Sequence, residues 1–489
     1  MNRMKGDFSR DTFNQRKHLL RVLMQQGRVQ IDADWNEQVS ILLHYVQSLA
    51  SDMIGPYGKV DGAFEVRVLE VDSDLESLLG KFHNGIEISQ LKKEHLKKSL
   101  ETKGNFIISP GHYYVDGLLC ENDEIIAYND QRGYPFPGSL KVEEINQQGN
   151  HLLVYLDVWE QHICWCEEAS NSIPGMREVA LGLYGPDTAT RSRLVWQAKI
   201  YLLEKGPFDC STFEDIKNEF QPKNRGFLRA MAKKEDSSVD DRCSANPSAK
   251  YMGAENQLYR VEIHRSSGHE KSTFKWSRDN GSVIFPVVEG KIFFPSGKNG
   301  YEMSLTLAHL GLDDSKALKK GDWVEFVHED QVLRNLAEPL LQVKDIDLQT
   351  MEVTLVTRKE LPSSPQSARR PILRRWDQSE SKNSEMNPEG DITIKEEEWI
   401  DIEDGIQILF KEPIQSTEKL HYRTGDYWLI PARVATKDIE WPNAPEGIPP
   451  HGVEHHYAPL AILHLEYDNK IEVVECENIK NLPFKFKIT

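Results

Sequence analysis

Three histidines near the carboxyl end of the chain form the densest group of side chains that could do chemistry. His451, His455 and His456 lie close together around Glu454. Imidazole is the commonest transition-metal ligand and can act as an acid or base near neutral pH. The preceding prolines and Gly452 argue against a helix that would align His451 with His455, so hydrogen bonding within a loop explains the group equally well. We predict no metal site. If the chain held one, His451, His455 and His456 would be its candidate ligands.

The segment His162-Ile-Cys-Trp-Cys166 offers three further soft donors. Zinc sites usually space their cysteines by two or more residues and need a fourth ligand from elsewhere. A Cys-x-Cys pair on a strand puts both thiols on one face, where cysteine commonly packs as a small apolar group. We therefore expect packing here rather than metal binding.

The residues Asp32, Asp34 and Asn36 resemble the opening of a calcium-binding loop. Such a loop needs glycine at its sixth position and glutamate at its twelfth, but this chain has Glu37 and Leu43 there. The start of a helix explains the acidic residues better, with Asp34 and Glu37 forming a capping box.

Two predicted turns combine aromatic, arginine and aspartate side chains, at 276–281 and 422–428. Carbohydrate-binding loops have this composition, and so do hairpin turns stabilised by an Asp–Arg pair. A glycosidase needs two carboxylates at a defined separation, and no pair stands out from the spacing. The sequence also has no phosphate-binding loop, no nucleophile elbow and no His-Glu-x-x-His motif. We predict no catalytic residues and no cofactor.

A long amphipathic helix is expected at 34–53, ended by Gly55-Pro56, after a shorter helix at 12–24. Apolar residues recur at three- and four-residue steps along the long helix. Such a stripe usually packs within its own domain, but it can also dock on a neighbouring subunit. The predicted partner interface comprises Phe8, Arg10, Phe13, Trp35, Val39, Leu42 and Val46, and the full stripe comprises Trp35, Val39, Leu42, Leu43, Val46, Leu49, Ala50 and Met53.

Beyond residue 60 the apolar residues alternate, which predicts strands. Residues 151–159 are apolar on both faces, as in a doubly covered strand, and Asp116-Gly117 and Asn280-Gly281 indicate tight hairpin turns. Residues 361–389 read as a loop.

We predict a mainly β (α+β overall) fold in which an N-terminal helical segment precedes two or more β-sandwich-like or barrel-like domains. The expected parts are a helical docking segment at 1–58, a β-rich domain at 59–209, a polar linker or exposed loop at 210–250, a second β-rich domain at 251–440 and a segment at 441–489 that closes the β core.

Composition narrows the class of protein further. A chain of 489 residues suggests about two to four domains. The net charge of −18 argues against nucleic acid or an anionic membrane as partner. The six cysteines read as reduced thiols, because a chain of this size does not need disulfides. With no signal peptide and no apolar run of about 18 residues, we expect a protein made in the cytoplasm, without direct membrane insertion, that leaves its cell by lysis or within a particle.

Long motifs along the chain carry a family resemblance. They are residues 6–38, Asp187-Thr-Ala-Thr-Arg191 and the segments 254–264, 273–281, 321–325, 371–377, 423–433 and 450–460. In this order they resemble an uncharacterised family encoded among phage-tail-like contractile injection systems, in gene clusters with sheath, tube and baseplate proteins. Ala198, where a bulkier residue is expected, and the lysine-rich stretch 91–103 depart from the pattern.

The resemblance implies a role in a particle and supplies no catalytic residues. We expect a non-enzymatic structural subunit, a baseplate, cap or fibre-associated part. Its partners would be baseplate, tube or sheath proteins and further copies of itself, with a trimer as the candidate arrangement by analogy with spikes and fibres. Two alternatives stay open. One is a carbohydrate- or receptor-binding module at the particle tip, with a row of exposed Trp and Tyr. The other is a cargo effector or cell-wall hydrolase, with a cleft where His451, His455 or His456 meets a carboxylate such as Glu454 or Asp426.

Overall fold

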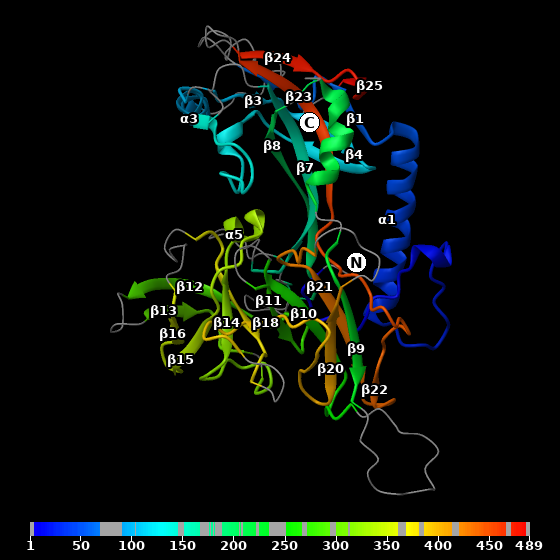
Figure 1. Cartoon of the computed structure of the whole chain (residues 1–489), viewed down its shortest axis with the longest axis vertical. Helices are drawn as coiled ribbons and strands as arrows, with labels where there is room; N and C mark the ends of the chain where they lie inside the picture. Colours follow the sequence, from blue (N-terminus) through cyan, green and yellow to red (C-terminus); the bar gives the residue numbers. More distant parts are fainter. Residues whose placement is uncertain are drawn as a thin grey trace, which may run out of the picture.

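The computed structural model is mainly β, with a helical N-terminal segment, as the sequence predicts. It is built from several sheets and one closed barrel (Figure 1). The structure describes residues 4–68, 90–102, 104–144, 151–166, 188–204, 209–221, 224–233, 251–266, 271–293, 300–311, 313–359, 368–380, 386–412, 420–465 and 471–485, with the single residues Met176, Glu178, Ala180 and Gly206.

The longest strands form the centre of the first region, at the top of Figure 1. Strands β7 (His151–Ile163) and β8 (Arg191–Leu203) pair antiparallel along their whole length. Strand β23 (His455–Leu465) pairs with the other edge of β7, and β24 (Ile471–Glu475) pairs with β23. Nearly every side chain of β7 is buried, as expected for a strand covered on both faces. Strands from residues 455–475 are therefore part of a sheet begun by residues 151–203.

A second sheet in this region holds the end of the N-terminal helix. Strand β1 (Tyr57–Asp61) lies between β25 (Lys480–Lys485), to which it is parallel, and β4 (Gly111–Val115), to which it is antiparallel. Strand β5 (Leu118–Asn122) completes the sheet through the predicted Asp116-Gly117 turn, in which both residues have positive φ. A small sheet of β2 (Val66–Arg67), β3 (Ile107–Ile108) and β6 (Ile126–Ala127) lies in the same core.

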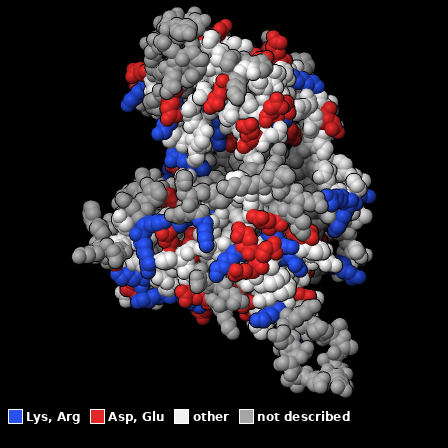
Figure 2. Space-filling model, viewed as in Figure 1, with Lys and Arg blue, Asp and Glu red and all other residues white. Residues whose placement is uncertain are grey.

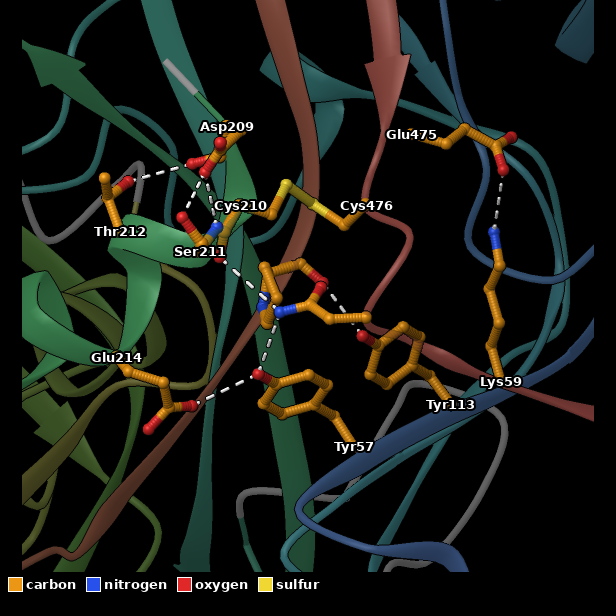
Figure 3. The surroundings of a disulfide bond; sticks show 12 residues. Tyr57, Lys59, Tyr113, Asp209, Cys210, Ser211, Thr212, Glu214, Glu475 and Cys476 are labelled. Atoms are coloured by element: carbon orange, nitrogen blue, oxygen red, sulfur yellow. Dashed lines mark hydrogen bonds and ion pairs between the residues drawn. A yellow bond between two sulfur atoms is a disulfide. The ribbon is translucent and has the colours of Figure 1, made fainter. Parts of the chain in front are cut away.

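A disulfide joins Cys210 to Cys476, 266 residues apart (Figure 3). Both cysteines are buried, and their Cα atoms lie 5.5 Å apart, within the range that a disulfide spans. The expectation that all six cysteines are reduced is therefore wrong. The expected linker at 210–250 is wrong in its first part too, because short helical turns and a strand occupy it: η5 (Cys210–Thr212), α4 (Phe213–Ile216), η6 (Lys217–Glu219) and β9 (Phe227–Ala232). Residues 234–250 lie outside the described part.

The second region packs two sheets around fully buried Trp276 and Trp428. One sheet has the order β18 (Ile392–Thr393), β11 (Thr273–Ser277), β10 (Gln257–Arg265), β21 (Tyr427–Arg433) and β22 (Asp438–Ile439). The other has the order β19 (Trp399–Asp401), β20 (Ile406–Lys411) and β9.

The barrel beside it closes in the order β12 (Ile284–Phe293), β13 (Tyr301–Leu307), β16 (Glu352–Thr357), β15 (Leu341–Asp347), β14 (Trp323–Val327) and β17 (Ile372–Trp376). Leu305, Leu355 and Leu373 are fully buried in its core. Strand β17 lies inside the stretch expected to be a loop at 361–389, so that prediction is wrong over these residues.

The helices stand outside the sheets. The long one is α1 (Asp32–Ile54), and the remaining helical elements are η1 (Gln15–Lys17), α3 (Gln90–Leu100), η2 (Tyr128–Asp130), η3 (Val142–Glu144) and α5 (Glu329–Arg334). Within the part of the chain that the structure describes, no helix combines the length and apolarity needed to cross a membrane.

Candidate assembly surface

Helix α1 packs on the molecule with its less apolar side. The sequence period correctly predicts the helix, but its buried residues are Ala33, Ser40 and Ile41. At 100° per residue these three lie opposite the apolar stripe. The helix begins at Asp32 and its N-cap residue, Ile31, makes no side-chain capping bond, so the predicted capping box of Asp34 and Glu37 is absent.

The apolar stripe of α1 faces away from the body. Trp35 is 67 % exposed, Val46 63 % and Leu49 61 %, and the helix stands at the edge of the molecule in Figure 1. Folding normally buries such residues, since each would gain about 1.5–3 kcal/mol from full burial. The prediction that the stripe packs within its own domain is wrong. We call the exposed side chains Trp35, Leu42, Leu43, Val46, Leu49 and Met53 the α1 apolar face.

The segment before α1 adds more exposed apolar surface. The helix predicted at 12–24 is wrong: η1 is the only helical turn described there, and His18 ends it in the left-handed conformation. The segment runs beside α1, because the Val22 amide donates to Gln38 Oε1 at 2.8 Å and the rings of Phe13 and His44 lie 6.0 Å apart. Its large exposed apolar residues are Leu19, Leu20, Leu23, Met24, Val29 and Ile31.

Charged residues of both signs border this exposed apolar surface. Helix α1 contains Asp and Glu but no Lys or Arg, whereas residues 16–28 contain Lys and Arg but no Asp or Glu. Figure 2 shows that positive and negative side chains both lie on the visible face. A surface that carries both signs can complement a second copy of itself.

The chain start fixes the lower end of α1. We call residues 4–9 the N-terminal strap. Asn280 Nδ2 donates to the carbonyls of Met4 and Gly6 at 3.0 and 2.9 Å, so the strap lies across the Asn280-Gly281 turn. Ser9 then donates through its amide and hydroxyl to Asp32 at 2.8 and 2.6 Å. The strap thus connects the first turn of α1 to the second region.

Lys5 of the strap enters a buried ionic cluster. Its ammonium lies 2.9 Å from Glu262 Oε1, and Glu262 also pairs with Arg260 at 2.6 Å and with Lys275 at 3.5 Å. Burial lowers the pKa of Lys5 to about 8, with Glu262 opposing the shift. Burial alone would raise the pKa of Glu262, but the surrounding cations outweigh it and hold that pKa well below its ordinary value.

The cluster continues into the barrel. Lys275 lies 2.8 Å from Glu325 of β14, whose other oxygen accepts from Trp376 Nε1 at 2.9 Å. Both Lys5 and Lys275 lie over the Trp376 ring, at 5.5 and 4.4 Å from its centroid. The N-terminal strap is therefore held where the second region and the barrel meet. Lys5 is not among the predicted site residues, because no local sequence pattern marks it.

The upper end of α1 is fixed by β1 and by the β4–β5 turn. Gly117 has a φ of +80°, and a Cβ atom placed there would lie 2.2 Å from the Gln47 carbonyl oxygen of α1. Lys480 of β25 donates to the Met53 carbonyl. Around the disulfide, Asn478 donates to Tyr57 at the start of β1 and Tyr57 donates to Glu214 (Figure 3). The disulfide thus lies beside the strand that continues α1.

The predicted interface residues separate into two groups. Trp35, Leu42 and Val46 are exposed on α1, and Val39 on the same stripe is half-buried. Phe8 and Phe13 are half-buried, and the exposed Arg10 lies 3.8 Å from Glu440. Phe8 belongs to the N-terminal strap and Arg10 and Phe13 follow it, whereas the α1 apolar face remains open to solvent.

The three candidate histidines do not converge. His455 and His456 are consecutive in β23 and so point to opposite faces of the sheet. His455 Nδ1 lies 2.6 Å from Asp157 Oδ1, and His456 Nδ1 lies 2.9 Å from Asp116 Oδ2. The His451 ring instead lies 5.8 Å from the Tyr427 ring. In the part of the chain covered by the structure, no group of three or more His, Cys, Asp or Glu residues could hold a metal ion.

The carboxylate paired with His455 in the structure is Asp157 of β7, a residue that the sequence does not suggest. Lys199 binds the second Asp157 oxygen at 2.6 Å. Burial would raise the pKa of Asp157, but His455 and Lys199 outweigh it and hold that pKa below its ordinary value. Asp426 instead accepts from Arg423 at 2.8 Å, and burial raises its pKa although Arg423 and Arg225 oppose the shift.

The remaining motifs are structural. Asp32, from the calcium-like motif, binds Ser9. The two aromatic turns contribute Trp276 and Trp428 to the core, and Asn280 holds the strap. Among the described residues, Trp35 and Tyr45 are the large aromatic side chains that stand exposed, and both are on α1. The row of exposed Trp and Tyr expected of a carbohydrate-binding module is not seen in these residues.

Comparison with known proteins gives one family. No curated protein matches the chain, and no solved structure matches it. A model described as a family of unknown function (DUF6519) matches residues 4–234 and 208–469. The two matches together span most of the sequence, from the N-terminal strap to residue 469, beyond the end of β23. The chain belongs to this family of unknown function, DUF6519.

Proposed function

We propose that this protein is a non-enzymatic structural subunit that assembles through the α1 apolar face, as a baseplate, cap or fibre-associated part of a phage-tail-like contractile injection particle. The exposed apolar face of α1 carries the assembly role. An apolar surface of more than a few hundred Å² is roughly what marks an interaction site on an otherwise polar molecule. The family resemblance of the sequence motifs supports the particle and its sheath, tube and baseplate proteins as partners.

The way α1 is held supports this assignment. The helix is tied at one end by the N-terminal strap and at the other by β1, so its apolar face is presented in a fixed orientation. A preorganised helix loses less conformational entropy on binding than a free segment does. Recognition would follow the helix-in-groove mode, with residues at three- and four-residue steps as anchors.

The decisive substitution is Val46→Lys with Leu49→Lys. Both side chains are exposed, and lysine is a good helix former, so folding should be unchanged. Particles purified from cells that carry the variant should lose the protein from the sheath-and-tube sediment. The matched control is Leu348→Lys, which changes an exposed leucine of the barrel far from α1 in sequence. Equal sedimentation of the variant and the control would contradict the proposal.

Self-association is the second part of the proposal. The acidic helix beside a basic segment favours contact between copies, with a trimer as the candidate arrangement. Light scattering on the purified protein should give a mass that is a multiple of the chain mass. The double lysine variant should lower that mass, and a monomer in both samples would restrict the surface to other partners.

A further inference from the structure

Two cysteine thiols meet at the end of the longest strand. Cys164 and Cys166 follow β7 directly, and their Sγ atoms lie 2.9 Å apart. Both residues are buried, at 5 % and 8 % exposed, and neither belongs to a disulfide. The separation lies between the roughly 2.0 Å of a disulfide bond and an ordinary non-bonded sulfur contact.

This contact depends on the backbone. Side chains two residues apart in an extended strand stand about 6.6 Å apart, so their sulfur atoms would be farther from each other than they are here. Strand β7 ends at Ile163, and the chain turns at Trp165 and Cys166. The turn brings the two side chains together, so the expected packing of two separate thiols on one strand face is replaced by direct contact between them.

The geometry does not fit a metal site. Two sulfur ligands of a tetrahedral zinc ion lie about 3.7 Å apart, as follows from Zn–S bonds of about 2.3 Å. The observed 2.9 Å is shorter, and the described residues supply no third ligand to complete a site. Val327 of β14 and Ile372 of β17 belong to the same buried hydrophobic cluster as Cys164 and Cys166.

We propose that Cys164 and Cys166 are a redox pair that forms a second, reversible intrachain disulfide. The oxidant is a low-molecular-weight disulfide. The thiolate of one cysteine attacks a sulfur atom of the oxidant and releases one thiol, and the second cysteine thiolate then attacks the mixed disulfide and releases the other. The protein loses two protons and two electrons, and the oxidant becomes two thiols.

The position of the pair gives this reaction a structural consequence. The thiols connect the end of β7, in the first region, with the barrel strands β14 and β17. A cross-link there would stiffen the turn that packs against the barrel. Because both thiols are buried, the exchange runs through local opening of the turn, so oxidation should be slower than for an exposed thiol.

A tryptic peptide isolates the pair. Residues 142–177 contain Cys164 and Cys166 and no other cysteine, lysine or arginine before the terminal Arg177. The full-length protein is incubated with oxidised glutathione, denatured, alkylated and digested. The peptide should then be lighter by two hydrogen atoms than its reduced form and carry no alkyl group. Reduction with dithiothreitol before alkylation should restore two alkylated cysteines.

Variants and controls decide the outcome. Cys164→Ser should leave Cys166 alkylated or carrying one glutathione, and Cys120→Ser should leave the cross-link unchanged. Burial raises the pKa of the Cys120 thiol, so that residue is a poor nucleophile. The peptides of Cys210 and Cys476 report in the same digest that native disulfides survive the procedure. Two alkylated or two glutathione-carrying cysteines in 142–177 after oxidation would overturn the proposal, as would zinc that is retained by the protein and lost in Cys164→Ser.

Discussion

Lys5 shows how one side chain places a distant helix. Its side chain is 26 % exposed and its ammonium reaches Glu262, while the backbone on either side is held by Asn280. Removing a partner from a buried ion cluster leaves charge uncompensated, but Arg260 and Lys275 still neutralise Glu262. The loss of Lys5 should therefore loosen the N-terminal strap more than it destabilises the ionic cluster.

We expect Lys5→Met to lower the free energy of unfolding by about 1–2 kcal/mol, below the full loss seen when a buried pair is broken. The segment 10–31 should also be cut faster by trypsin, which cleaves at Arg16, Arg21 and Arg28. Urea unfolding and limited proteolysis measure the two effects. The control is Lys320→Met, which removes an exposed ion pair with Asp345 and should change stability by less than about 0.5 kcal/mol. Unchanged proteolysis of Lys5→Met would show that Lys5 does not hold the strap.

Glu403 gives the molecule a pH dependence near neutrality. Its side chain is 23 % exposed, and burial raises its pKa to about 7, with Arg278 opposing and Asp377 and Asp404 adding to the shift. The raised pKa means that the folded chain keeps a proton that the unfolded chain loses above about 4.5. The stabilisation that comes from this bound proton is complete below pH 4.5 and is lost as the pH rises through 7.

Glu403→Gln should remove that dependence. Glutamine does not titrate and still accepts a hydrogen bond from Arg278. The free energy of unfolding of the variant should therefore rise relative to that of the wild type between pH 4.5 and 8, by about 1–2 kcal/mol after allowance for solvent screening. Thermal unfolding at a series of pH values gives the difference. A constant difference across this range would mean that Glu403 titrates normally.

At the scale of elements, periodicity identifies α1 but not the direction it faces. A stripe of apolar residues shows that a helix has an apolar side and leaves open what covers that side. Here Ala33 and Ser40 allow close packing on the body, so the small side is buried and the large side is exposed. The helix expected at 12–24 fails for a related reason, because a short helix without a packing partner is marginal in water.

The strands, too, can be predicted only in part from the sequence. Alternation and the Asp116-Gly117 turn locate β4 and β5 correctly. Strand β17 lies within a stretch rich in Pro and Ser, and its Arg374 and Arg375 suggest exposure, yet every residue of the strand is buried. The reason is that Arg375 pairs with Asp377 and donates to backbone carbonyls of 315 and 317, which lie far away in sequence. The site shares this limit: helix α1 can be predicted from the sequence, but the exposure of its apolar face, the roles of Lys5 and Asp157, and the cysteine pairing cannot.

Gly117 tests how α1 is docked. Gly117→Ala places a methyl group against the Gln47 carbonyl and requires a left-handed conformation that alanine disfavours. We expect a loss of about 2–3 kcal/mol in the free energy of unfolding and faster amide hydrogen exchange along α1. The control is Gly321→Ala, which has a positive φ but open space around it. Equal exchange in α1 for both variants would argue against the contact.

At the scale of the whole molecule, the chain closes on itself. Strands β23, β24 and β25, from residues 455–485, join sheets that contain β7 and β1, and the Cys210–Cys476 disulfide joins η5 to the residue that follows β24. Such long-range pairings leave no local pattern, which is why the strand order and the disulfide could not be derived from the sequence.

Replacing both Cys210 and Cys476 with serine should lower the free energy of unfolding by about 2–4 kcal/mol, the usual effect of removing a cross-link over a long loop. Denaturant unfolding under non-reducing conditions measures the loss. Dithiothreitol should destabilise the wild type by a similar amount and leave the double serine variant unchanged. An effect of the reductant on the variant would point to another cross-link.

The placement of β1 determines how the molecule bears mechanical load. Helix α1 runs into β1 through Gly55 and Pro56, and β1 lies between β25 and β4. A tensile force on the helix along the chain would shear β1 past both neighbours, so that all the ladder hydrogen bonds resist together instead of opening one after another. A component pulled on by a moving machine would gain from an attachment that fails only in this strong direction.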